Sequence, residues 1–163
     1  MSEMDVIEKQ PVTLRVNGNV HELEIAPART LLDVLRSELR LTGAKRSCNQ
    51  GVCGACSVLR DGKPVRACIS LAVAAEDSEI TTIEGLADGN RLSRVQQAFV
   101  DAGAVQCGFC MPAMVIAATA LLNENPNPDV EEIRHGLGGN ICRCSGYVKV
   151  VDAILSLTEG GKS

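Results

Sequence analysis

Apolar and polar residues alternate with a period of two near the start of the chain, as they do in half-buried β-strands. Residues 12–16, Val-Thr-Leu-Arg-Val, follow this pattern, and Asn17-Gly18 then predicts a tight turn into a second strand at 20–25. After Thr30, a good N-cap residue, the period changes to that of a helix, because the leucines and valine that follow share one helical face. This stretch is therefore predicted to fold as a hairpin followed by one helix.

A second hairpin is predicted beyond a loop rich in glycine and cysteine at residues 43–56. Asp61-Gly62 is a favoured two-residue turn, and it lies between apolar stretches at 57–59 and 65–69. Residues 79–83 predict one more strand. Together these signals indicate a mixed sheet with one helix in the first half of the chain.

Helical periodicity dominates the second half of the chain. Four helices are predicted, at residues 91–102, 112–123, 129–137 and 147–158. A stretch containing glycine, aspartate and asparagine at 84–90 separates them from the predicted sheet. We therefore predict an α+β fold with two domains, 1–85 and 86–163.

Length and cysteine content narrow how such small domains could be stable. The chain has 163 residues and eight cysteines, and two domains of this size would bury only modest cores unless metals or disulfides reinforced them. Residues 1–10 are acidic and polar and carry no export signal, and the longest apolar run, 111–122, is too short to span a bilayer. We therefore expect a cytoplasmic location and no membrane span, where cysteines serve as metal ligands more often than as disulfides.

Charge and aromatic content argue against nucleic acid as a partner. The net charge is −4, whereas nucleic acids and anionic membranes select for a basic face. The chain has one tyrosine, two phenylalanines and no tryptophan, too few for a platform on which bases stack.

The first cysteine group has the spacing C-x4-C-x2-C with a distant fourth cysteine, which is typical of plant-type [2Fe–2S] ferredoxins. Its members are Cys48, Cys53, Cys56 and Cys68. Gly51 and Gly54 lie between the ligands, where they let the backbone curl and bring N–H groups close to sulfur. A structural zinc site is the alternative, but zinc prefers two C-x2-C pairs and only one occurs in this group.

The second cysteine group consists of two close pairs. Its members are Cys107, Cys110, Cys142 and Cys144. Cys110 directly precedes a predicted helix, whose free N–H groups would favour an anionic cluster. Cys142 and Cys144 are expected in an extended stretch, where residues two apart point to one side. Zinc is a stronger alternative here, because four cysteines in two pairs are its usual ligands, although the one-residue gap of the last pair is less typical of zinc.

Three segments of the chain resemble the small iron–sulfur subunit of the molybdenum hydroxylases. They are Ser-Cys-Asn-Gln-Gly-Val-Cys-Gly-Ala-Cys at 47–56, Gln-Cys-Gly-Phe-Cys at 106–110 and Gly-Asn-Ile-Cys-Arg-Cys-Ser-Gly-Tyr at 139–147. This family includes xanthine dehydrogenase, aldehyde oxidase, carbon monoxide dehydrogenase and bacterial hydroxylases of heteroaromatic compounds. The resemblance extends over about residues 10–158, nearly the whole chain, and it implies that both cysteine groups hold [2Fe–2S] clusters.

The resemblance also implies a fold, a role and partners. The fold would be a β-grasp, plant-type ferredoxin-like domain followed by an all-α four-helix domain. The second cluster would lie next to the molybdopterin of a large subunit, with Gln106 and Cys144 touching the pterin, and the first cluster nearer the FAD of a medium subunit. Electrons would pass from molybdenum through both clusters to FAD, in a complex that is usually a dimer of heterotrimers.

The chain itself is not expected to carry substrate chemistry, since it offers no Ser/His/Asp set and no credible general base. The second hypothesis is a free-standing two-cluster ferredoxin. A fixed subunit should expose apolar side chains around its clusters, whereas a mobile carrier should surround its cluster with charge. Small departures from the commonest family pattern, at Ser47, Ser57, Met111 and Ser145, are expected to retune hydrogen bonds to sulfur rather than to remove ligands.

Overall fold

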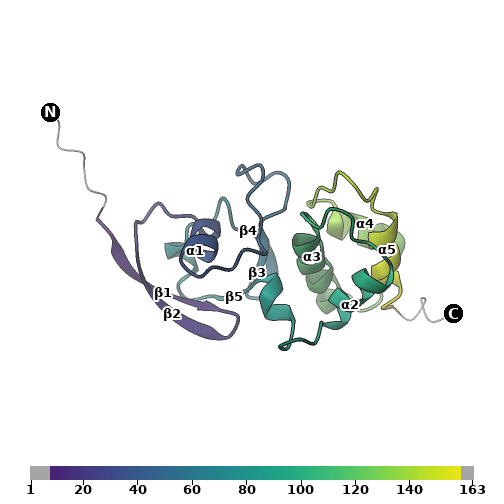
Figure 1. The fold of residues 1–163 in the computed structure, drawn as a ribbon, viewed down its shortest axis with the longest axis horizontal. Coiled ribbons are helices and arrows are strands. Elements are labelled where there is room, and N and C mark those ends of the chain that lie inside the picture. Colours follow the sequence, from purple (N-terminus) through teal and green to yellow (C-terminus); the bar gives the residue numbers. More distant parts are fainter. Residues whose placement is uncertain (1–7, 159–163) are drawn as a thin grey trace.

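The computed structural model describes residues 8–158, in which a strand-rich part and a helical part lie side by side (Figure 1). One sheet contains five strands: β1 (Gln10–Val16), β2 (Asn19–Ile25), β3 (Ser57–Arg60), β4 (Lys63–Arg66) and β5 (Glu79–Thr81). Their order is β2-β1-β5-β3-β4, with β1 and β5 parallel and the other neighbouring pairs antiparallel. The predicted mixed sheet is thus confirmed.

Both predicted hairpins form through turns in which two consecutive residues have positive φ. These angles are 52° at Asn17 and 76° at Gly18, and 51° at Asp61 and 79° at Gly62. Asparagine, aspartate and glycine tolerate this conformation, which matches the twist of the flanking strands. The second turn pairs Arg60 with Lys63 and so fixes the register of β3 and β4.

Helix α1 (Leu31–Ser37) packs its apolar face into the core of the strand-rich part. Thr30 caps it as predicted, because its hydroxyl accepts a hydrogen bond of 3.1 Å from the Asp33 N–H. Leu31 and Leu35 belong to the same buried cluster as Leu14 of β1. Burying each of these leucines contributes about 1.5–3 kcal/mol, which ties the helix firmly to the sheet.

Two strand ends differ from the sequence prediction. The strand predicted at 65–69 ends at Arg66, because the tight turn before it sets β4 opposite the four residues of β3. The chain then turns, with the Ile69 N–H donating to the Arg66 carbonyl, so Cys68 lies in a turn and not on a strand. The last strand ends at Thr81, and a 3₁₀ turn (Ile83–Leu86) follows; a shorter one (Val73–Ala75) precedes β5.

Four helices form the second part: α2 (Arg94–Asp101), α3 (Met111–Glu124), α4 (Val130–Leu137) and α5 (Val148–Leu155). The helix predicted from residue 91 begins three residues later, because Ser93 and Gln96 form a capping box at its N-terminus. Asp129 caps α4 in the same way, with Glu132 as its partner.

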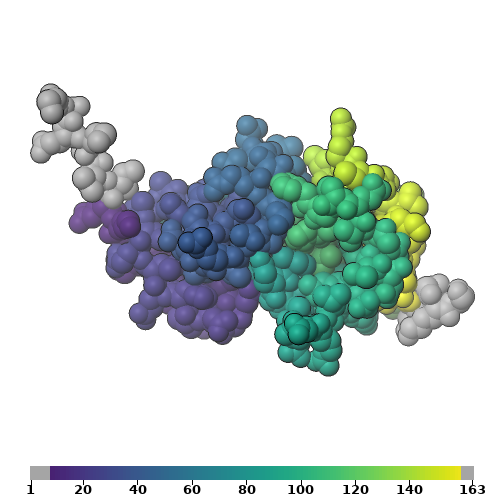
Figure 2. All heavy atoms as spheres, viewed as in Figure 1, coloured from purple at the N-terminus to yellow at the C-terminus, as the bar shows by residue number. Residues whose placement is uncertain are grey.

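Helix α3 connects the two parts of the molecule. It packs against α2 and α4 on the helical side and against β3 and β4 on the sheet side. Ile116 and Ala120 of α3 form a buried cluster with Leu59 of β3. Figure 2 shows the two parts packed directly against each other. Among residues 8–158, none of the helices has the length and apolar character that crossing a bilayer requires.

Candidate metal centres

The first three cysteines of the N-terminal group lie on one curled loop. Asn49, Gly51 and Gly54 all have positive φ, of 55°, 75° and 74°, which bends the loop back on itself. The Lys45 N–H donates to the Ala55 carbonyl at 3.0 Å and so closes the base of the loop. Cys68 reaches the same region from the turn after β4, and its thiol interacts with that of Cys56.

Backbone N–H groups inside this loop point at sulfur. The Cys48 Sγ accepts hydrogen bonds of 3.4 Å from the N–H groups of Cys53 and Gln50. These donors, Cys53 first, lower the pKa of Cys48 to about 6, so this thiol is readily held as the thiolate that iron requires. Burial raises the pKa of Cys56 to about 11; a hydrogen bond from the Cys68 backbone opposes this shift, and the Cys68 thiol adds to it. A bound cation is therefore what would favour deprotonation of the buried thiol.

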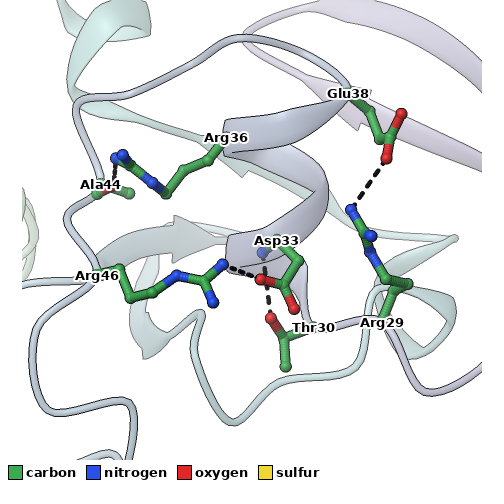
Figure 3. Close-up of polar contacts among 7 residues, drawn as sticks. All are labelled: Arg29, Thr30, Asp33, Arg36, Glu38, Ala44 and Arg46. Carbon is green, nitrogen blue, oxygen red and sulfur yellow. Dashed lines mark hydrogen bonds and ion pairs between the residues drawn. The ribbon is translucent and has the colours of Figure 1, made fainter.

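Helix α1 holds the start of this loop in place, as Figure 3 shows. Arg36 donates from Nη1 to the Ala44 carbonyl at 2.8 Å (Figure 3). The same nitrogen donates to the Thr42 carbonyl at 2.9 Å. Arg46, two residues before the first cysteine, pairs with Asp33. Partial burial acts to raise the pKa of Asp33, but hydrogen bonds from Thr30 and Arg46 hold it below its usual value.

All four cysteines of the second group line one cavity of about 250 Å³. Cys110 is the residue before α3, and Cys142 and Cys144 lie on the loop between α4 and α5. The expectation of an extended stretch there is wrong, since residues 143–145 bend, yet both thiols still reach the cavity. Cys53 of the first group also contributes to the cavity wall.

The thiols of the second group are arranged as two pairs. The Sγ atoms of Cys107 and Cys144 lie 3.6 Å apart, and the Cys110 thiol interacts with that of Cys142. Burial, followed by the neighbouring Cys142, raises the pKa of Cys110 to about 12, and Cys107 raises the pKa of Cys144. Two irons that each take two thiolates would match this arrangement in pairs.

A mononuclear zinc site fits the donor set less well. Within residues 8–158, no three or more Cys, His, Asp or Glu side chains converge as ligands of a single metal ion do. Four thiols spread as pairs around one cavity match a two-iron cluster, whereas zinc needs a tetrahedron around one point. The residues present therefore fit [2Fe–2S] better than zinc.

Ser145 and Tyr147 hold Cys142 in place; the sequence predicted a hydrogen bond to sulfur for Ser145, but it gave no such role to Tyr147. The Cys142 Sγ accepts hydrogen bonds from the Ser145 hydroxyl at 3.1 Å and from its N–H at 3.3 Å. Although burial acts to raise the pKa of Cys142, these donors lower it to about 7. The Tyr147 hydroxyl accepts from the Cys142 N–H at 2.9 Å and donates to the Asn140 carbonyl at 3.2 Å. The one feature of the sequence that could have pointed to Tyr147 is its position at the end of the 139–147 motif, which contains Cys142.

Apolar side chains surround the second group at the surface. Val105, Phe109 and Ile141 are 46%, 45% and 52% exposed. Gln106 and Cys144 are exposed in the same region. On the first loop Val52 is exposed, and Ile69, also exposed, packs over Gly51. Exposed apolar side chains thus lie beside both cysteine groups, and the exposed Arg143 also lines the cavity of the second group.

The two cysteine groups are joined directly by backbone. The Ile141 N–H donates to the Cys53 carbonyl at 2.9 Å, which connects one ligand residue of the first group to the residue before Cys142. Beside this bond, Gly139 packs against the Arg66 guanidinium, where a Cβ would overlap it.

Comparison with known proteins gives the same picture. Residues 14–87 match the family described as "2Fe-2S iron-sulfur cluster binding domain", and residues 82–155 match the "[2Fe-2S] binding domain". The chain is 45% identical to the nicotinate dehydrogenase small FeS subunit of Eubacterium barkeri, over 94% of this chain and 98% of that protein. It is 44% identical to the xanthine dehydrogenase iron-sulfur-binding subunit of Escherichia coli O157:H7, over 93% and 96%.

The fold of the chain also matches solved structures of oxidoreductases. The chain superimposes on quinoline 2-oxidoreductase from Pseudomonas putida 86 with a TM-score of 0.88 and 42% identity, covering 91% of each chain. It superimposes equally well, at 0.88 and 44% identity, on the aldehyde oxidoreductase of Desulfovibrio desulfuricans, covering 94% of this chain but only 18% of that one. A module of this size and fold thus occurs both as a separate chain and as a small part of a larger one.

Proposed function

This chain belongs to the small iron–sulfur subunits of the molybdenum hydroxylases, and we propose that each of its cysteine groups holds one of its two [2Fe–2S] clusters. As a member of this family it is the electron-transfer subunit of an oxidoreductase complex. The ligands of the first cluster are Cys48, Cys53, Cys56 and Cys68, and those of the second are Cys107, Cys110, Cys142 and Cys144. One observation carries the second assignment: all four thiols line a single cavity as two pairs.

Each cluster, when bound, takes up and releases one electron at a time. The chain's own contribution is to supply thiolates, to donate hydrogen bonds to them, and to fix the separation of the two sites. The N–H groups of Gln50 and Cys53 act on the first site, and Ser145 acts on the second. Because a reduced cluster is more negative, such donors favour reduction and raise its potential.

We also propose which cofactor of the partner subunits each site faces. The second site faces the molybdopterin of the large subunit, with Gln106 and Cys144 as pterin contacts, and the first faces the FAD of the medium subunit. The exposure of Gln106, Cys107 and Cys144 supports this, because a partner's cofactor could approach them directly. The two-residue sequence Gln106-Cys107 would then place one pterin contact next to one cluster ligand.

A permanent complex explains the surface better than a mobile ferredoxin does. Val105, Phe109 and Ile141 are about half exposed around the second site, where a carrier that binds transiently would present charge.

We further propose a dimer of heterotrimers, a cytoplasmic location, and a β-grasp domain of residues 1–85 followed by a four-helix domain of residues 86–163. The overlap of the two family matches at residues 82–87 supports that boundary.

Substrate choice is placed on the large subunit. The relatives act, by name, on nicotinate, xanthine and aldehydes, yet their identities to this chain are all between 40% and 45%. Similar identity to subunits of enzymes with different named substrates supports placing substrate choice outside this chain. The chain is accordingly assigned no catalytic residue.

The test is metal analysis of the complex that forms around a tagged copy of the chain in its native host. About four irons and about one molybdenum per chain are expected, two irons for each cluster. Iron without molybdenum, on a chain that is purified alone, would favour the free-standing ferredoxin. Zinc in place of iron would overturn the ligand assignment.

A further inference from the structure

Arg66, the last residue of β4, bridges the two cysteine-bearing loops. Its Nη1 donates to the Ser57 hydroxyl at 2.6 Å, and its Nη2 donates to the carbonyl of Gly139, 73 residues away in sequence. Ser57 begins β3 just after the first loop, and Gly139 begins the segment that leads to Cys142. One planar guanidinium therefore binds both sides of the junction.

Asn140 reaches across the same junction from the opposite side. It is only 4% exposed, and its Nδ2 donates to the Gly54 carbonyl at 3.2 Å and to the Ser57 hydroxyl at 3.4 Å. The Ser57 hydroxyl in turn donates to the Gly54 carbonyl at 2.7 Å. All the hydrogen-bonding positions of this hydroxyl are thus occupied: it donates once, and it accepts from both Arg66 and Asn140.

These bonds surround the one backbone hydrogen bond that joins the ligand-bearing loops, from the Ile141 N–H to the Cys53 carbonyl. The backbones also touch beside it, since a Cβ on Gly54 would overlap the Gly139 carbonyl oxygen. Both loops are irregular, so no strand or helix ladder holds them together. Their separation depends on the side chains that bridge them.

We propose that Arg66 and Asn140 are positioning residues for electron transfer between the two clusters, because they clamp the Cys53 loop against the Cys142 loop. This inference rests on the proposed function of the two cysteine groups. Neither residue ligates iron; both act by keeping the Ile141–Cys53 contact closed. Electron transfer weakens steeply as the path between two centres lengthens, so opening this contact slows the relay without removing either cluster.

Arg66 has a second effect that a test must separate from the first. Its positive charge also acts on Cys56, where it lowers the thiol pKa against a larger effect of burial. Loss of that charge should lower the potential of the first cluster. Lysine keeps the charge but cannot form the forked contact with Ser57 and Gly139, so Arg66→Lys isolates the clamp.

The experiment uses the intact complex and compares Arg66→Lys, Arg66→Met and Asn140→Ala with the wild type. Arg60→Lys is the matched control, because Arg60 lies on the neighbouring strand and donates to Ser78 and to the Ala74 carbonyl, both within the sheet part. Three quantities are measured: iron per chain, hydrogen exchange of the Ile141 amide, and the inter-cluster transfer rate after flash reduction. EPR-monitored titration adds the two midpoint potentials.

Arg66→Lys and Asn140→Ala should keep about four irons per chain. They should expose the Ile141 amide to exchange and slow inter-cluster transfer relative to the wild type, because the path between the two clusters lengthens. Arg66→Met should do the same and also lower the potential of the first cluster, while Arg60→Lys stays at wild-type values. Wild-type exchange and transfer rates in both Arg66→Lys and Asn140→Ala would overturn the clamp. A wild-type complex without two EPR signals would instead overturn the proposed function itself.

Discussion

The backbone N–H of Ile141 donates a 2.9 Å hydrogen bond to the carbonyl of Cys53, and this bond links the two cysteine groups. It connects Cys53, a proposed ligand of the first cluster, to the neighbour of Cys142, a proposed ligand of the second. Cys53 also lines the cavity of the second group. The sites are therefore adjacent parts of one structure, and several consequences can be measured.

Ser145 should tune the second cluster. Its hydroxyl donates to the Cys142 sulfur at 3.1 Å, so Ser145→Ala should lower the potential of that cluster only. The shift is about 59 mV if the hydrogen bond favours the reduced form tenfold. Ser145→Thr keeps the hydroxyl and should stay near wild type in EPR-monitored titration. Ser156→Ala is the control. It removes a hydroxyl that donates a hydrogen bond to the Ala153 carbonyl in the last turn of α5. Equal potentials in the Ala and Thr variants would contradict this role.

Tyr147 should stabilise the second site through its hydroxyl alone. Tyr147→Phe leaves the Cys142 N–H and the Asn140 carbonyl without their partner, which should cost about 1–3 kcal/mol. The second cluster should then be lost faster on mild heating while the first is retained. The EPR signal of each cluster, recorded over time, measures this loss. Equal loss of both signals would show that the hydroxyl supports the whole fold and not this loop.

Gly54 should tolerate no side chain. Its φ is 74°, and a Cβ would overlap the Gly139 carbonyl oxygen. Gly62 has φ 79° but nothing within 4 Å of its Cβ position, so Gly62→Ala provides a control with the same backbone strain. Gly62→Ala should cost about 1–2 kcal/mol, and Gly54→Ala clearly more, by urea unfolding of the loaded protein. Equal costs would mean that the loops are not in contact.

The pairing of Asp33 with Arg46 should make stability depend on pH. The native pKa of Asp33 is below its usual value, so its contribution is present above the unfolded-state pKa and is lost as pH falls through the native pKa. Asp33→Asn should therefore be less stable than wild type at neutral pH, with the difference shrinking as pH is lowered. Urea unfolding at a series of pH values tests this. A difference that stays constant with pH would rule out the charge as its origin.

Local signals in the sequence predicted the elements that local chemistry determines. Asn17-Gly18 and Asp61-Gly62 form the hairpin turns, and Thr30 and Asp129 cap their helices. The end of β4 was missed, since the apolar residues after Arg66 continue the strand pattern while hydrogen bonding turns the chain.

The spacing of the cysteines predicted both groups, but the residues between the groups could not be predicted. Arg66 and Gly139 are 73 positions apart, and Asn140 and Gly54 are 86 apart. No periodicity or motif relates them, because they meet only once α3 has packed the helical part against the sheet. Ser57 looked like a minor departure from a family pattern, and its role is clear only where both side chains reach it.

Two separate four-cysteine sites are tested most directly by iron content and EPR of the dithionite-reduced complex, in wild type and in Cys56→Ala and Cys110→Ala variants. With both clusters bound, the wild type should give two distinct [2Fe–2S] signals and about four irons per chain. Each variant should lose one signal, a different one in each case, and about half the iron. Both signals surviving in either variant, or both disappearing in each, would contradict two sites that each depend on their own four cysteines.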